Sequence, residues 1–226
     1  MTNISNAVLV HGAWADASSW SKLIPLLLES GLKVTAVQLP LTSFEADVDA
    51  VTRAIALAEG SVVLIGHSYG GAVITQAGND PKVASLVYVD GFAPDSGESA
   101  GSLFAKFETA PLNAEIRPDA QGFLKLTRDG IYNLFAQDLT DAEKSLLLAT
   151  QGPINAAALG GIVHEAAWKT KRSWYLIGDA DQAIAQREQE KMASRMGATI
   201  AHADTSHVAM LAKPEAVAKL VLQAAA

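Results

Sequence analysis

A serine with glycines two positions away on either side is the strongest chemical signal in the sequence. Residues Gly66-His67-Ser68-Tyr69-Gly70 fit the pattern G-x-S-x-G, in which the serine projects from a sharp strand-to-helix turn. Small flanking residues permit this crowded backbone, and the helix N-terminus offers partial positive charge to an oxyanion. In a chain with 17 glycines the string alone is weak, but an apolar run precedes it and a small-residue run follows it. This setting favours a nucleophile over an inert serine in a glycine-rich turn.

A serine nucleophile needs a base to accept its proton, and histidine is the usual one. His207 is the best candidate by topology, because it follows the last expected strand at the same sheet edge as Ser68. An ordinary loop histidine is the alternative interpretation. We expect the side chain of His67 to point away from the neighbouring serine. His202 lies inside an expected strand, and His164 lies in an inserted segment where it could line a pocket.

A carboxylate completes such a pair by fixing the imidazole tautomer and stabilising the imidazolium. Asp181 lies just past the expected strand 173–177, and Asp90 lies just past the expected strand 83–89. Both agree with the chain order serine, aspartate, histidine. We favour Asp181 and keep Asp90 as the alternative.

Acyl transfer also requires two backbone N–H donors for the oxyanion. Tyr69 directly follows the serine, so its amide is one candidate. The other is the amide of Ala13 in the loop His11-Gly12-Ala13-Trp14, which follows the first expected strand. A plain strand-ending turn is the alternative for this loop.

The elements that must position these residues alternate along the chain. Continuously apolar runs separated by helical patterns indicate an α/β fold, with a mostly parallel six-stranded sheet flanked by helices. One helix is expected from residue 19 to Gly31, and another from Thr42, with Glu45 as its capping-box partner, to Gly60. The expected strands are residues 7–10, 33–39, 61–65, 83–89, 173–177 and 199–203.

Residues 95–168 break this alternation and carry no strand pattern. A helix is expected after Thr140, with Glu143 as its capping-box partner, and another over 155–163. We expect a helical cap over one end of a core made of residues 1–94 and 169–226, in a single domain overall.

Aromatic residues near the oxyanion loop and in the cap suggest an apolar acyl or alcohol site, although each could serve packing alone. No cationic cluster is placed to bind a charged substrate. The candidates for the pocket are Trp14, Phe92, Phe104, Tyr132, Phe135 and Trp168.

Composition excludes several functions. The 226 residues are 50% hydrophobic and 18% charged, which excludes a disordered chain. The absence of cysteine excludes disulfides, thiol catalysis and thiolate metal sites. The net charge of −7 argues against nucleic acid as a partner. No apolar run approaches the roughly 20 residues of a membrane span. The polar start at residues 1–6 lacks a basic signal region, so we expect a cytoplasmic protein.

Neither a metal site nor a cofactor is expected, because the histidines lack zinc-ligand spacing and no dinucleotide glycine pattern is present. The expected partner is a small-molecule ester. The sequence is compatible with a homodimer and does not determine the oligomeric state.

Four segments resemble one known family. The loop 11–14, the turn 66–71, the strand end Leu86-Val87-Tyr88-Val89 and the segment 206–211 are similar to the α/β-hydrolase superfamily. Within it they resemble the branch of plant methyl-ester esterases and hydroxynitrile lyases with their small bacterial relatives. The resemblance implies a sheet that enters at the third strand of the full fold. It also implies Ser68, His207 and Asp181 as nucleophile, base and acid, and the amides of Ala13 and Tyr69 as the oxyanion hole.

Two positions bear on the activity. Hydroxynitrile lyases of this type carry a lysine after the catalytic histidine, where this chain has Val208, and a threonine where it has Gly12. We therefore expect a serine carboxylesterase that cleaves esters of small, mostly apolar compounds through an acyl-enzyme. The alternatives are a lyase or C–C bond hydrolase with the same triad, and a catalytically silent ligand-binding relative.

Overall fold

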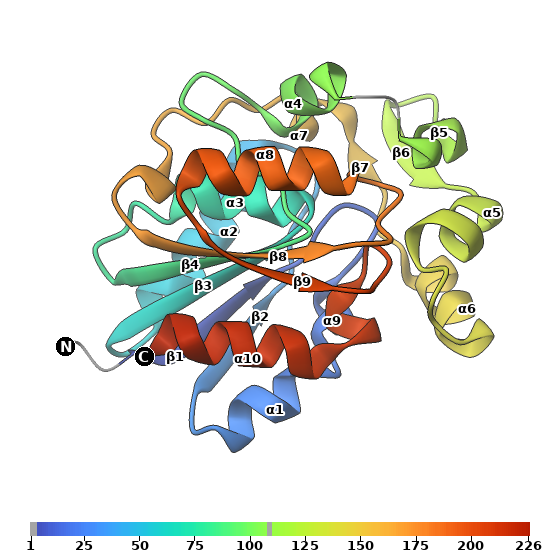
Figure 1. Cartoon of the computed structure of the whole chain (residues 1–226). Coiled ribbons are helices and arrows are strands. Elements are labelled where there is room, and N and C mark those ends of the chain that lie inside the picture. The colour runs from blue at the N-terminus through green and yellow to red at the C-terminus, as the bar shows by residue number, and fades with distance from the viewer. Residues whose placement is uncertain (1–3, 108–109) are drawn as a thin grey trace.

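The apolar runs of the sequence form one sheet of six strands in the order β2-β1-β3-β4-β8-β9 (Figure 1). The computed structural model describes residues 4–107 and 110–226; residues 1–3, in the polar start, and 108–109, in the inserted segment, lie outside the described part. All pairings within this sheet are parallel, which confirms the expected fold. The strands are β1 (Ile4–Val10), β2 (Lys33–Val37), β3 (Ser61–His67), β4 (Val83–Val89), β8 (Arg172–Gly178) and β9 (Thr199–Ala203).

Burial separates the inner strands from the edges. β1, β3, β4 and β8 are buried along nearly their whole length, whereas most residues of β2 and β9 are at least partly exposed. Parallel strands buried in this way need helices on both faces. One face is covered by α1 (Leu23–Glu29) and α10 (Pro214–Ala225), and the other by α2 (Phe44–Leu57), α3 (Tyr69–Ala77) and α8 (Gln186–Met196) (Figure 1). None of the helices in the described residues is long and apolar enough to cross a membrane.

Local signals set the helix ends, with small shifts from the expected positions. Gly31, just past α1, has a φ of +90°, which glycine adopts at little cost. The N-cap of α2 is Ser43, whose Oγ accepts a hydrogen bond from the amide of Ala46 at 3.2 Å. The prediction that Thr42 caps this helix is wrong by one residue. Threonine and serine are both favourable N-cap residues, so the sequence did not distinguish Thr42 from Ser43. The helix expected from residue 19 starts instead as a 3₁₀ turn, Ala17–Trp20, followed by α1.

Because the strands are parallel, their carboxyl ends meet at one edge of the sheet. Val10 at the end of β1 pairs with Gly66 in β3, and His67 pairs with Val89 at the end of β4. The loops after β1, β3, β4, β8 and β9 therefore converge. They carry, in that order, His11–Trp14, Ser68, Asp90, Asp181 and His207.

The inserted segment between β4 and β8 contains strands as well as helices. β5, β6 and β7 form an antiparallel sheet, so the expectation of a purely helical cap is wrong. These strands have only two to four residues, too few for an alternating pattern to show. The elements are α4 (Ala100–Lys106), a 3₁₀ turn (Pro111–Glu115), β5 (Ile116–Pro118), β6 (Phe123–Leu126), α5 (Arg128–Gly130), a π-helical turn (Ile131–Phe135), α6 (Asp141–Thr150), β7 (Ile154–Asn155), α7 (Ala156–Leu159) and a 3₁₀ turn (Ala167–Lys169).

The two helices expected in the insertion differ in outcome. α6 begins after Thr140 with the expected capping box, since Thr140 and Glu143 bond each other's backbone amides. The helix expected over 155–163 is limited to α7, which ends at Leu159 with Gly160 as its C-cap.

Glu143 also ties the cap to the core. Its Oε1 lies 2.5 Å from Nζ of Lys22, which precedes α1 and also donates to the carbonyl of Leu211 at 2.9 Å in α9 (Ala209–Ala212). The hydrogen bond from Lys22 is the main cause that lowers the pKa of Glu143 from 4.5 to about 2. The ion pair is therefore present at neutral pH.

Glu143→Gln tests this link, because glutamine keeps the cap geometry and loses the charge. A carboxyl whose pKa is lowered on folding stabilises the protein above its unfolded pKa, and the contribution is lost as the pH falls through the folded value. We expect the variant to be less stable by about 1 kcal/mol at pH 7, as for partly exposed pairs, and the gap to shrink between pH 4.5 and pH 2. Urea unfolding at pH 7 and pH 3.5 measures this; an equal gap at both pH values would contradict the prediction.

Candidate active site

Ser68 occupies a strained turn between β3 and α3. Its φ of +51° and ψ of −123° are rare for a residue with a side chain. Glycines make this turn sterically possible: a Cβ on Gly66 would lie 2.6 Å from the carbonyl oxygen of Gly70, and one on Gly70 would lie 2.5 Å from that of Val10. The strand-to-helix turn that the sequence pattern indicated is thus the observed conformation.

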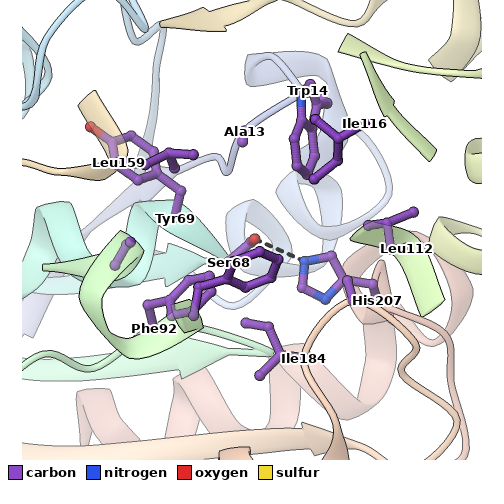
Figure 2. A pocket seen from close by; sticks show the side chains of 14 residues that line it. Ala13, Trp14, Ser68, Tyr69, Phe92, Leu112, Ile116, Leu159, Ile184 and His207 are labelled. Carbon is purple, nitrogen blue, oxygen red and sulfur yellow. Dashed lines mark hydrogen bonds between the residues drawn. The ribbon is translucent and has the colours of Figure 1, made fainter. Parts of the chain in front are cut away.

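Ser68, His207 and Asp181 form a continuous chain of hydrogen bonds. Nε2 of His207 lies 2.8 Å from Oγ of Ser68, and Nδ1 lies 2.7 Å from Oδ2 of Asp181. All three residues are buried, and Figure 2 shows Ser68 facing the imidazole. A carboxylate only accepts hydrogen bonds. The proton of a neutral imidazole therefore sits on Nδ1, and Nε2 is left to accept the proton of the serine.

Asp181 is held by donors from its own loop and from α8. Its Oδ1 accepts the amides of Ala183 at 2.7 Å and Ile184 at 3.0 Å, and its Oδ2 also accepts Nε2 of Gln189 at 2.7 Å. Gln189 is fully buried. It was missed in the sequence because a glutamine in a polar helix carries no motif. These three donors fix the orientation of the carboxylate toward His207.

Asp90 hydrogen-bonds backbone amides instead of the ring of His207. Its Oδ1 accepts the amide of Gly178 at 2.7 Å, and its Oδ2 accepts that of Ala209 at 3.4 Å. Burial, and secondly the nearby carboxylate of Asp181, raise the pKa of Asp90 well above its usual value. The structure thus pairs Asp181, and not its alternative, with the histidine.

Two other buried histidines hold the backbone of this site. Nε2–H of His67 donates to the carbonyl of His207 at 2.7 Å, so its ring serves the histidine loop and does not bond Ser68. Nε2 of His11 accepts the amide of Leu39 at 3.0 Å, and its Nδ1–H donates to the carbonyl of Gly12 at 2.8 Å. Burial lowers the pKa of both imidazoles. Both rings are therefore neutral and serve to hydrogen-bond the neighbouring backbone.

The remaining histidines lie away from the pocket. His202 forms a partly exposed pair with Asp179 at 2.7 Å. His164, which could have lined a pocket, is exposed in the insertion.

The amides of Ala13 and Tyr69 lie beside Ser68, and neither has a hydrogen-bond acceptor within residues 4–107 and 110–226. Both residues line the same pocket (Figure 2). The hydroxyl of Tyr69 donates to Oδ2 of Asp47 at 2.7 Å, and Oδ1 of Asp47 accepts the amide of Leu41 at 2.7 Å. Asp47, from α2, was not singled out in the sequence. It anchors the side chain of the residue that directly follows Ser68.

An apolar pocket opens beside Ser68, with about 510 Å³ of empty space including the part open to solvent. Of the aromatic candidates, Trp14, Phe92 and Phe104 line it. Leu112, Ile116, Leu159 and Ile184 also line it and were not anticipated, because apolar residues in short elements carry no signal of direction (Figure 2).

The other three aromatic candidates do not line this pocket. Tyr132 bonds Ser145 near the surface, and Nε1 of Trp168 donates to the carbonyl of Pro94 at 2.9 Å. Phe135 packs edge-on against the His207 ring, with centroids 5.1 Å apart. A residue's aromatic character did not indicate the direction of its side chain.

A parallel α/β sheet with a strained serine turn at its carboxyl edge, beside a histidine from the last strand's loop, is the arrangement of the α/β hydrolases. Comparison with known proteins agrees: the model of the alpha/beta hydrolase family matches residues 7–220. The chain belongs to this family.

The chain is similar in sequence to proteins named as esterases. Methylesterase 8 of Arabidopsis thaliana is 27% identical over 234 residues, which cover 92% of this chain and 85% of the relative. A carbendazim hydrolyzing esterase of Nocardioides sp. (strain SG-4G) is 34% identical over 119 residues, 46% of this chain and 48% of the relative. The crystal structure of a pyrethroid hydrolase from Sphingobium faniae JZ-2 shares the fold, with a TM-score of 0.85 and 21% identity over 98% of this chain and 97% of that one.

Gly70→Ala tests the steric argument for the turn. The new methyl group would meet the carbonyl oxygens of Val10 and His11 at 2.5 and 2.6 Å, and this backbone cannot move away independently of the sheet. We expect the free energy of unfolding to fall by about 1–3 kcal/mol. Gly160→Ala is the matched control, because its methyl group would meet only an ordinary contact at 3.5 Å. Equal urea midpoints for the two variants would contradict the argument.

Proposed function

We propose that this chain is a serine carboxylesterase that cleaves esters of small, mostly apolar compounds. The observation that carries the proposal is the hydrogen-bond chain from Ser68 through His207 to Asp181, with Ser68 opening into an apolar pocket. The relatives named as a methylesterase and a carbendazim hydrolyzing esterase support ester hydrolysis within the family.

In the acylation step, Oγ of Ser68 attacks the ester carbonyl carbon while Nε2 of His207 accepts the hydroxyl proton. Asp181 stabilises the imidazolium that forms. The carbonyl oxygen becomes an oxyanion and accepts hydrogen bonds from the amides of Ala13 and Tyr69. The carbon–oxygen bond to the leaving group then breaks, and His207 returns its proton to the departing alkoxide. The alcohol leaves, and the acyl group remains on Ser68.

Deacylation reverses these roles with water. His207 accepts a proton from a water molecule as its oxygen attacks the acyl carbon, and the same two amides hold the second oxyanion. The bond to Oγ of Ser68 breaks, and the serine recovers its proton from His207. The carboxylic acid leaves, and the free enzyme is restored.

The lining of the pocket supports a neutral substrate. Besides Ser68 and His207, two lining residues have a polar side-chain group, and both groups are engaged. Nε1 of Trp14 donates to the carbonyl of Leu124 at 2.9 Å, and the hydroxyl of Tyr69 donates to Asp47. No lysine, arginine, aspartate or glutamate lines the described pocket. A charged acyl or alcohol group would therefore lose its hydration without gaining a partner.

Steric and electrostatic features oppose the lyase alternative. A Cβ at Gly12 would lie 2.7 Å from Cβ of Ser68, so this backbone has no room for the threonine found there in hydroxynitrile lyases. Val208 is buried directly after His207 and supplies no positive charge for a leaving cyanide. The intact hydrogen-bond chain likewise speaks against a silent binding protein.

Ser68→Ala tests the nucleophile. Without the hydroxyl no acyl-enzyme can form, so we expect hydrolysis of p-nitrophenyl acetate to fall by about 10⁴-fold or more, close to background. Ser21→Ala, at an exposed serine outside the pocket, should hydrolyse the ester normally. Near-normal turnover by Ser68→Ala would refute the mechanism.

Asn substitutions separate the two candidate acids. Asp181→Asn supports the wrong imidazole tautomer, so we expect kcat to fall by about 10⁴-fold. Asp90→Asn replaces a carboxyl whose pKa is already raised by burial and which does not reach His207, so kcat should change by less than about tenfold. The reverse ranking in steady-state kinetics would assign the acid to Asp90.

A further inference from the structure

One stretch of the cap contacts both loops that carry the proposed acid and base. Directly after the π-helical turn, Nε2 of Gln137 donates to the carbonyl of Ala180 at 2.7 Å. Oδ2 of Asp138 accepts the amide of Ser206 at 2.8 Å, and its Oδ1 accepts the hydroxyl of Ser206 at 2.5 Å. Ala180 immediately precedes Asp181, and Ser206 immediately precedes His207.

We infer that Gln137 and Asp138 are positioning residues that set the geometry of the His207–Asp181 pair. The inference rests on the proposed function, because it assigns a role in activating Ser68. The two residues are neighbours in sequence, so they fix the two loops relative to each other from outside the sheet. From within the core, the amide of Ala180 bonds the carbonyl of Thr205 at 3.1 Å and joins the same loops.

Burial explains why Asp138 matters for the histidine loop. Ser206 is fully buried, and in the described chain Asp138 is the acceptor of both its amide and its hydroxyl. Hydrogen bonds to a carboxylate are stronger than neutral ones. Although Asp138 itself is exposed, removal of its carboxylate would take the fixed, charged acceptor from two buried donors and leave them only water that enters in its place. The loop would shift to satisfy them and would carry His207 with it.

Small shifts of this loop affect catalysis strongly. A displacement of about 1 Å in a catalytic group can cost about 100-fold in rate. Phe135 also restricts the position of His207. Its ring packs on the imidazole with centroids 5.1 Å apart, and it contacts the ring of Trp14 with centroids 6.4 Å apart. The alternative is that these contacts only attach the cap to the core. That role would affect substrate binding and stability, but not the reactivity of Ser68 itself.

The test compares four variants by steady-state hydrolysis of p-nitrophenyl acetate and by the rate at which a fluorophosphonate probe labels Ser68. For Asp138→Ala we expect kcat and the labelling rate to fall about 10- to 100-fold, with KM changed by less than about threefold. Asp138→Asn should recover most of this loss, because its amide can accept from the Ser206 amide and donate to the Ser206 hydroxyl. Gln137→Ala should lower both rates by a smaller factor. Asp129→Ala is the matched control, an exposed aspartate of the same cap without a side-chain hydrogen bond in the described residues.

Wild-type labelling rates for both Asp138→Ala and Gln137→Ala would overturn the inference, as would losses confined to KM. If Asp138→Ala does not fold, a wild-type labelling rate in Gln137→Ala overturns the inference, and a reduced one supports it. The probe also separates this inference from the proposed function. A wild-type protein that is labelled at Ser68 but hydrolyses no ester contradicts the proposed function, while the comparison of labelling rates still decides the role of Asp138.

Discussion

The close approach of the first turn of α3 to the sheet is the constraint on which the rest of the site depends. The backbone of Gly70 lies against the carbonyl oxygens at the end of β1, and a Cβ on Gly71 would lie 2.5 Å from the carbonyl oxygen of Phe92 after β4. The helix is thus seated on two strand ends at once. This seating holds the unusual backbone of Ser68 and places its side chain in the pocket that Ala13 and Tyr69 also line. A looser helix would separate these groups.

Around this turn, the buried titratable groups are arranged so that positive charge develops on His207 during the proposed reaction. Burial lowers the pKa values of His11 and His67, so both rings are neutral at pH 7, and burial raises the pKa of Asp90. All three groups form directed hydrogen bonds to the backbone. Asp181 is the carboxylate that hydrogen-bonds the imidazole of His207, and it accepts from four donors in all. A positive charge that forms on His207 during the reaction therefore meets one fixed carboxylate, and no competing charge is held by the neighbouring histidines.

The parts of this arrangement that the sequence predicted follow from strand direction. Ser68, His207 and the two aspartates each follow a strand expected from the sequence, and parallel strands bring the loops at their carboxyl ends together. The sequence did not predict the features that depend on the direction of individual side chains in space, because no sequence pattern indicates that direction. Gln189, Asp47 and Asp138 reach the site from helices and a cap loop, the strands of the cap are too short to show a period, and Tyr132 and Trp168 turn away from the pocket. Chain order and strand ends allowed both Asp181 and Asp90, and the hydrogen bond of Asp181 to His207 supplies the physical reason for the preferred choice.

The cap has a small sheet of its own, and this has a consequence for how such an enzyme could change over evolution. β5, β6 and β7 pair with one another and with no strand of the core in the described residues. The tip of the β5–β6 hairpin, around Gly122, faces solvent with a φ of +80° and nothing within 4 Å of its would-be side chain. Lengthening such a turn has a small entropic cost and leaves the register of the core strands unchanged. Substrate preference can therefore diversify through the hairpin, while residues 135–138, which contact the loops of the acid and the base, restrict where insertions are tolerated.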